Sequence, residues 1–188
     1  MQTSAEIVQR LREGNERFVN HELSGNLLDS RRREALVEGQ APQAVVLSCA
    51  DSRVVPEMIF DAGLGELFVI RVAGGVANTS AIASIEYAVS ALKTPVIVVM
   101  GHESCGAVAA ALDGADLGPN LGHLLEQIAP ACRAVDEPSV PTVVMKNAEF
   151  AAKALVDRSR IIADAVAANG VSIVVAYYEL STGRVVFP

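Results

Sequence analysis

Residue types that bind metals gather in two short strings of this sequence, Cys49-Ala-Asp51-Ser-Arg53 and His102-Glu-Ser-Cys105. Together the strings supply two thiols, an imidazole and a carboxylate, in a chain that has only three cysteines. Zn²⁺ binds such ligands tetrahedrally, and a catalytic site leaves one of the four positions to water or substrate. We therefore predict that Cys49, His102 and Cys105 bind zinc, and that Asp51 competes with water for the fourth position.

The charge of this ligand set suggests a role for Asp51. Zinc with two thiolates and a neutral imidazole is formally neutral, so its bound water ionises less readily than at a three-histidine site. If Asp51 took the fourth position, no water would be activated. Arg53 can instead hold Asp51 by a charge-assisted hydrogen bond. This pairing would leave the fourth position to hydroxide and keep Asp51 as an acceptor for its proton.

Four strings, in order and spacing, resemble the β-class carbonic anhydrases. They are residues 49–56 (CADSRVVP), 65–71 (GELFVIR), 84–89 (SIEYAV) and 98–108 (VVMGHESCGAV). The resemblance runs from about residue 5 to the last strand. It implies a zinc enzyme in which zinc-bound hydroxide attacks carbon dioxide to give bicarbonate, with Asp51 and Arg53 as a gating pair.

The resemblance also implies a substrate pocket and an assembly. Gln40 matches a glutamine that hydrogen-bonds substrate or bicarbonate across a dimer interface. Phe68 and Tyr87 match aromatic residues that line the apolar pocket for carbon dioxide, and Gly106 matches a glycine whose backbone N–H could bind an anion. The expected assembly is a homodimer, which could pair further into a tetramer.

Within that family the chain is closer to the plant-type subgroup, which has the active-site glutamine. A second, allosteric subgroup has a tryptophan three residues before the first cysteine, in an inhibitory bicarbonate site. Here Val46 occupies that position and the chain contains no tryptophan. We therefore expect that form of regulation to be absent.

Composition favours one globular domain over residues 1–188, with a helical arm at 1–40 and a zinc-binding core at 41–188. Apolar residues make up 51% of the chain and charged residues 20%, which excludes a disordered chain. The net charge of −7 argues against nucleic-acid binding, and the apolar strings are too short to span a membrane. Two cysteines at a metal leave no disulfide framework, and the first residues lack a signal-peptide pattern, so we expect a cytoplasmic protein.

Apolar runs alternate with helical patterns along the chain, which predicts an α/β fold. We expect a single domain with a central, mostly parallel sheet flanked by helices, a C-terminal edge strand and an N-terminal helical arm. The expected strands are 44–48, 67–71, 96–100, 171–176 and 184–187, and the expected helices are 4–20, 30–38, 80–92, 105–112 and 143–168.

This order of elements predicts where the metal ligands meet. Cys49 and His102 lie at the carboxyl ends of the first and third strands, and Cys105 lies on the first turn of the following helix. Sites in open parallel sheets form beyond the carboxyl ends of the strands. A helix N-terminus also favours the thiolate form of a cysteine.

The first helix has an apolar face that carries Ile7, Leu11 and Phe18. The helices at 80–92, 105–112 and 143–168 already suffice to cover the predicted sheet. We therefore expect a partner subunit to bury the face of the first helix, which favours an obligate homodimer.

Other functions are compatible with the same metal ligands. A hydrolase of carbonyl sulfide or carbon disulfide could use the same metal chemistry on the same fold. A zinc-stabilised subunit without activity would keep Asp51 on the metal. The ligands could also close around a purely structural zinc, or Cys49 and Cys105 could be buried structural thiols.

Five side chains have a simpler structural interpretation beside the functional one. Phe68 and Tyr87 could be ordinary core aromatics. Cys132 is interpreted as a plain thiol on a helix. His21 and His123 could carry protons, although surface histidines are common.

Overall fold

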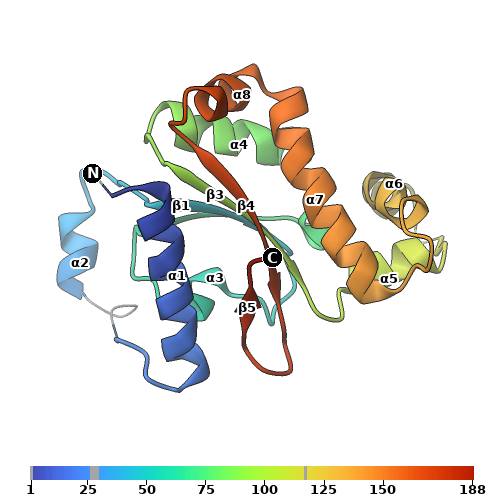
Figure 1. Ribbon diagram of the computed structural model, residues 1–188, viewed down its shortest axis with the longest axis horizontal. Helices are drawn as coiled ribbons and strands as arrows, with labels where there is room; N and C mark the ends of the chain where they lie inside the picture. Colours follow the sequence, from blue (N-terminus) through green and yellow to red (C-terminus); the bar gives the residue numbers. More distant parts are fainter. Residues whose placement is uncertain (1, 26–29, 117) are drawn as a thin grey trace.

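Five strands form a single sheet in the computed structural model, which describes residues 2–25, 30–116 and 118–188 (Figure 1). The strand order is β2-β1-β3-β4-β5, and every neighbouring pair is parallel except β4 and β5. The strands are β1 (Ala44–Ser48), β2 (Leu67–Arg71), β3 (Val96–His102), β4 (Ser172–Tyr178) and β5 (Val185–Val186). The predicted α/β domain with a mostly parallel sheet and a C-terminal edge strand is confirmed.

Helices cover both faces of the sheet, because β1 and β3 are mostly apolar strands, rich in valine, that are buried on both sides. Figure 1 shows α4, α7 and α8 on one side of the sheet and α1 and α3 on the other. The helices are α1 (Ser4–Val19), α2 (Ser30–Ala35), α3 (Pro56–Ile59), α4 (Thr79–Ser90), α5 (Gly106–Leu112), α6 (Pro119–Arg133), α7 (Val140–Arg158) and α8 (Arg160–Ala167).

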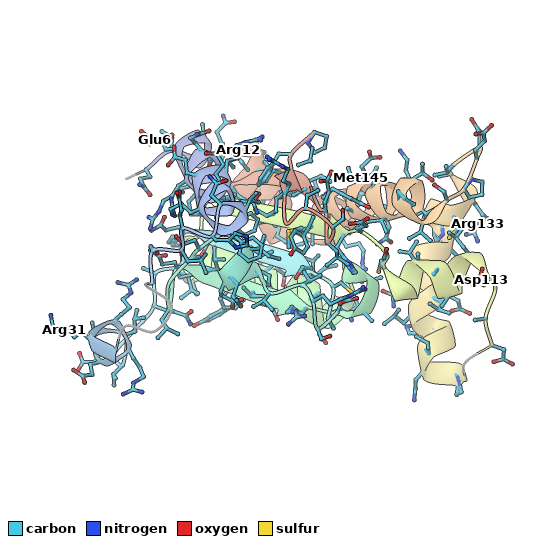
Figure 2. All side chains as sticks on the ribbon, turned by 90° about the horizontal axis from the view of Figure 1, so that it is seen from below. Glu6, Arg12, Arg31, Asp113, Arg133 and Met145 are labelled. Atoms are coloured by element: carbon cyan, nitrogen blue, oxygen red, sulfur yellow. The ribbon has the colours of Figure 1, made fainter. Side chains whose placement is uncertain are left out.

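The molecule is elongated along the sheet. Figure 2 shows α2, with Arg31, standing apart at one end, and Asp113 and Arg133, at the ends of α5 and α6, at the opposite end. None of the helices formed by the described residues has the length and apolar character needed to cross a membrane.

The apolar face of α1 packs against the sheet of its own chain. Ile7 and Leu11 are buried in one cluster with Val46 and Val98 of the central strands, and Phe18 packs against the same cluster. The expectation that this face needs a partner subunit is therefore wrong. Among the helices of the described residues, α4, α7 and α8 lie on the other face, whereas α1 and the one-turn α3 cover this one together with the C-terminal residues Leu180 and Phe187.

The predicted helix over 143–168 is two helices, α7 and α8. The chain becomes extended at Ser159, where φ is −125° and ψ is 110°. The Ser159 hydroxyl accepts a hydrogen bond from the backbone N–H of Ile162 and donates one to Glu86 of α4. Ser159 therefore ends one helix and caps the next.

Other boundaries also differ from the prediction. The helix expected over 30–38 ends at Ala35 and is followed by a turn, and the helix expected from 105 begins at Gly106. Two helices, α3 and α6, were not predicted. Cys132 does lie on a helix, near the end of α6.

Candidate metal centre

Three predicted ligands meet at the carboxyl edge of the sheet. β1 and β3 run side by side, with Ser48 opposite Met100, so the residues that follow their ends lie together. Cys49 comes directly after β1, His102 ends β3, and Cys105 caps the N-terminus of α5. One ligand atom from each lies within 4.8 Å of the other two, and all three residues are buried.

The imidazole of His102 is oriented for metal binding. Its Nδ1 atom lies 2.8 Å from the backbone carbonyl oxygen of Glu103. Because a carbonyl oxygen can only accept, Nδ1 carries the hydrogen and donates this hydrogen bond. The Nε2 atom then has a free lone pair, is buried and has no hydrogen-bond partner among the described residues. A buried nitrogen without a partner is costly unless a ligand such as a metal ion satisfies it. The donor set therefore fits a zinc ion.

The pKa values of the two clustered thiols are shifted in opposite directions. A hydrogen bond from Cys105 is the main influence that lowers the pKa of Cys49, to about 4, against the opposing effect of burial. The same hydrogen bond, followed by burial, raises the pKa of Cys105. These shifts favour the thiolate form of Cys49 and the protonated form of Cys105. The charge of the thiolate attracts a cation, which can displace the remaining proton.

Asp51 is held beside this cluster by Arg53. The guanidinium donates two hydrogen bonds, from Nε to Oδ1 at 2.9 Å and from Nη2 to Oδ2 at 2.8 Å, which form a bidentate pair. The Arg53 backbone N–H also donates a hydrogen bond to Oδ1. These bonds hold the pKa of Asp51 far below its usual range. The Oδ2 atom lies 4.0 Å from Nε2 of His102, so the ionised carboxylate faces the cluster without joining it.

Arg71, at the end of β2, stabilises the loop that carries two of these groups. Its guanidinium donates hydrogen bonds from Nε to the carbonyl of Cys49 at 3.0 Å and from Nη2 to the carbonyl of Asp51. Sequence reasoning did not assign it this role. The available signal was its position, since Arg71 ends the strand beside β1, opposite Ser48.

The structure does not bring three of the predicted pocket residues to the cluster of Cys49, His102 and Cys105 in their own chain. These residues are Gln40, Phe68 and Tyr87. Phe68 pairs with Val45 in the first half of β1, and Gln40 comes four residues before that strand. A strand rises about 3.3 Å per residue, so β1 separates these positions from the carboxyl edge by roughly 10 Å or more. The rings of Phe68 and Tyr87 contact each other, with centroids 6.2 Å apart, and Tyr87 is 51% exposed.

The remaining candidates lie at different places. Gly106 is the first residue of α5 and directly follows Cys105. His123 is exposed on α6, with Nδ1 3.7 Å from a carboxylate oxygen of Glu126, and His21 is exposed in the turn after α1. Cys132 is half-buried, and burial raises the pKa of its thiol.

Curated proteins of similar sequence are carbonic anhydrases. Residues 44–185 match the carbonic anhydrase family. The chain is 41% identical over 183 residues to "Carbonic anhydrase 2" of Mycobacterium tuberculosis, covering 94% of this chain and 88% of that protein. It is 40% identical over 182 residues to the carbonic anhydrase of Mycolicibacterium smegmatis, covering 93% and 88%.

Solved structures of similar fold are β-carbonic anhydrases. A tetrameric enzyme from Sordaria macrospora superposes with a TM-score of 0.76 at 24% identity, over 97% of this chain and 96% of that one. The Coccomyxa enzyme, solved with acetazolamide, gives 0.75 at 25% identity, over 93% and 83%. With the sequence matches and the cluster of two cysteines and a histidine, these similarities show that the chain belongs to the β-carbonic anhydrase family.

Proposed function

We propose that this protein catalyses the reversible hydration of carbon dioxide to bicarbonate and a proton, with one zinc ion per protomer bound by Cys49, His102 and Cys105. The observation that carries the proposal is the ionised Asp51 carboxylate, held by Arg53 at the edge of the cluster. A zinc ion bound there would supply the Lewis acidity that activates water toward carbon dioxide.

Asp51 has two proposed roles that depend on Arg53. While Arg53 holds the carboxylate, Oδ2 can accept a hydrogen bond from the attacking water and orient it. If the hydrogen bonds from Arg53 break, the same oxygen is close enough to the cluster to become a fourth metal ligand. The fourth position would then no longer be open to water. The pair would thus act as a gate.

The substrate pocket is proposed to form between two protomers. Gln40 precedes β1, Phe68 lies in the first half of β2, and Tyr87 on α4 contacts Phe68, so all three lie toward the end of the sheet opposite the cluster of their own chain. In a homodimer, these residues of one protomer would face the cluster of the other, beside its Gly106. The Sordaria macrospora relative is tetrameric, which supports an assembled form, and the proposal extends to a dimer of dimers.

The proposal places this enzyme in the cytoplasm. All three cysteines are free in the structure, and two of them form the metal cluster. A reducing compartment keeps such thiols available as ligands, whereas an oxidising one favours disulfides.

Metal analysis combined with a stopped-flow hydration assay tests the function. Purified protein should contain about one zinc per chain and accelerate hydration of carbon dioxide well beyond the uncatalysed rate. Carbonyl sulfide and carbon disulfide are assayed in parallel with the same preparation. Zinc-loaded protein that hydrates no carbon dioxide would overturn the proposal, and turnover of a sulfur substrate alone would reassign the enzyme to that reaction.

A further inference from the structure

Asn147 of α7 is a buried polar residue that contacts the turn beneath the metal cluster. It is 6% exposed, and its side-chain Nδ2 donates to the backbone carbonyl of Gly74 at 2.8 Å. Gly74 lies in the short helical turn Ala73–Gly75 that follows β2. Its own backbone N–H donates to the Sγ atom of Cys49 at 3.3 Å. Gly74 is therefore held at its carbonyl by Asn147 while its N–H contacts a predicted metal ligand.

Any residue other than glycine would be strained at position 74. Its φ of +71° is in the left-handed region, which a residue with a Cβ rarely adopts. A Cβ added there would also lie 2.7 Å from Cδ1 of Ile128. Gly75 has a positive φ as well, so two successive residues leave the ordinary helical region. The contact from Asn147 adds to the turn's own hydrogen bond, which the Gly75 N–H donates to the carbonyl of Val72.

The α7 helix, which makes that contact, packs against the strand that ends in His102. A Cβ at Gly101, the residue before His102, would lie 2.5 Å from Cγ1 of Val144, so α7 packs directly on the end of β3. Val144 and Asn147 are three residues apart and lie on the same face of the helix. The helix is thus fixed next to one predicted ligand while its Asn147 side chain reaches the turn that contacts another.

We propose that Asn147 is a positioning residue of the metal centre, which through Gly74 directs a backbone N–H at the sulfur of Cys49. The inference rests on the proposed function in one respect, that the cluster binds zinc. A hydrogen bond to a metal-ligating sulfur orients the sulfur and tunes the charge it donates, and groups in this position commonly change metal affinity.

A second buried asparagine supplies the matched control. Asn15 of α1 is 5% exposed and, like Asn147, donates to backbone carbonyls, those of Ile59 and Gly183. These contacts join α1 to α3 and to the turn before β5, away from the cluster. Asn15 also accepts a hydrogen bond from the backbone N–H of Val185, so replacing it removes more buried hydrogen bonds than replacing Asn147, but of the two asparagines only Asn147 is connected to Cys49.

The experiment compares Asn147→Leu, Asn15→Leu and the unaltered full-length chain. Zinc affinity is measured by competition with a chelator, and the thiolate-to-metal charge-transfer band is recorded after Co²⁺ substitution. We expect Asn147→Leu to bind zinc about tenfold more weakly and to shift the cobalt band. Asn15→Leu should lose thermal stability but keep both metal readouts.

Each outcome separates this inference from the function on which it rests. If Asn147→Leu loses stability while zinc affinity and the cobalt band match the unaltered chain, Asn147 is only a packing residue and the inference is wrong. If the unaltered chain binds no metal, the proposed function is wrong, and the inference, which rests on zinc binding, is wrong as well. Should Asn147→Leu not fold, Asn147→Ser, which removes the amide but keeps a polar group, gives the same comparison.

Discussion

Arg53 holds the carboxylate of Asp51 through two parallel hydrogen bonds, from Nε to Oδ1 and from Nη2 to Oδ2. The two residues are separated by a single serine, so the pair forms within one turn of the loop after β1. A carboxylate this close to two thiols and an imidazole would otherwise be a natural fourth ligand for zinc. Under the proposed function, the guanidinium would thus compete with a bound zinc ion for the same oxygen atoms.

Replacing Arg53 should therefore inhibit the enzyme through Asp51. We expect Arg53→Ala to lower the hydration rate about tenfold to a hundredfold near neutral pH, since hydrogen bonds to a charged group contribute about 1.5–3 kcal/mol. Hydroxide competes better with the carboxylate as the pH rises, so the loss should shrink at alkaline pH. Stopped-flow rates across pH measure this.

The control for this prediction is Arg160→Ala. Arg160 forms an exposed pair with Asp164 on α8 and should leave the rate unchanged. Because the pKa of Asp51 lies far below its usual range, the carboxylate of the unaltered enzyme does not titrate near neutral pH. An Arg53→Ala enzyme with unaltered rates at every pH would contradict the gate.

Two cysteines provide a test of the ligand set. Cys105→Ala removes one of the clustered thiols and should abolish both tight zinc retention and hydration activity. Cys132→Ala removes the half-buried thiol on α6 and should keep both. Zinc per chain after dialysis against a chelator is the measurement, and a fully metallated, active Cys105→Ala protein would show that the ligands are misassigned.

The clustering of the three predicted metal ligands could be foreseen from sequence because their signals are local. Cys49 and His102 each follow an apolar run, and the end of a parallel strand is where such sites form. The supporting contacts are not local. Asn147 reaches Gly74 across 73 positions of sequence, and neither residue type indicates that contact in advance. The role of Arg71 likewise depends on which strand lies beside β1.

The errors in the predicted fold have similar causes. The periodicity of Ile7 and Leu11 predicts an apolar face but not the surface that buries it, and the structure places that face on its own sheet. The break at Ser159 depends on a hydrogen bond to Glu86 of a distant helix. Pro119 begins α6 at a position where proline is favoured, although proline also marks loops.

Asp61 gives a prediction about stability and pH. Its side chain is fully buried and accepts hydrogen bonds from Arg17 and from the backbone and hydroxyl of Ser24, which joins the end of α1 to the loop after α3. Burial alone would raise the pKa of Asp61, but these hydrogen bonds outweigh it and the pKa is lowered. The ionised carboxylate therefore stabilises the fold.

Asp61→Asn should lower the free energy of unfolding by about 1–3 kcal/mol near neutral pH. A lowered pKa contributes stability above the unfolded value of 3.8, and that contribution is lost as the pH falls through the folded value. The difference in the free energy of unfolding between the variant and the unaltered chain should thus become smaller below about pH 4. Urea unfolding at several pH values measures it, with the exposed Asp157→Asn as a control near zero, and a difference that widens on acidification would contradict the prediction.

The last prediction concerns the shared pocket. Gln40 precedes β1 and Cys49 follows it, so one chain cannot place both at one metal ion. In a dimer with shared sites, a Cys105→Ala chain still contributes its Gln40 to the site of its partner. A Gln40→Ala partner contributes all three metal ligands to that same site. One of the two sites in such a heterodimer then has every residue it needs.

A heterodimer of Cys105→Ala and Gln40→Ala chains, purified through two different tags, should recover about half of the unaltered dimer's hydration rate. This should hold even though the Cys105→Ala homodimer is inactive and the Gln40→Ala homodimer is slow. A heterodimer of Cys105→Ala with the unaltered chain gives the reference for one working site. If instead the mixed dimer shows only half the rate of the Gln40→Ala homodimer, each protomer uses its own Gln40, and the shared pocket is wrong.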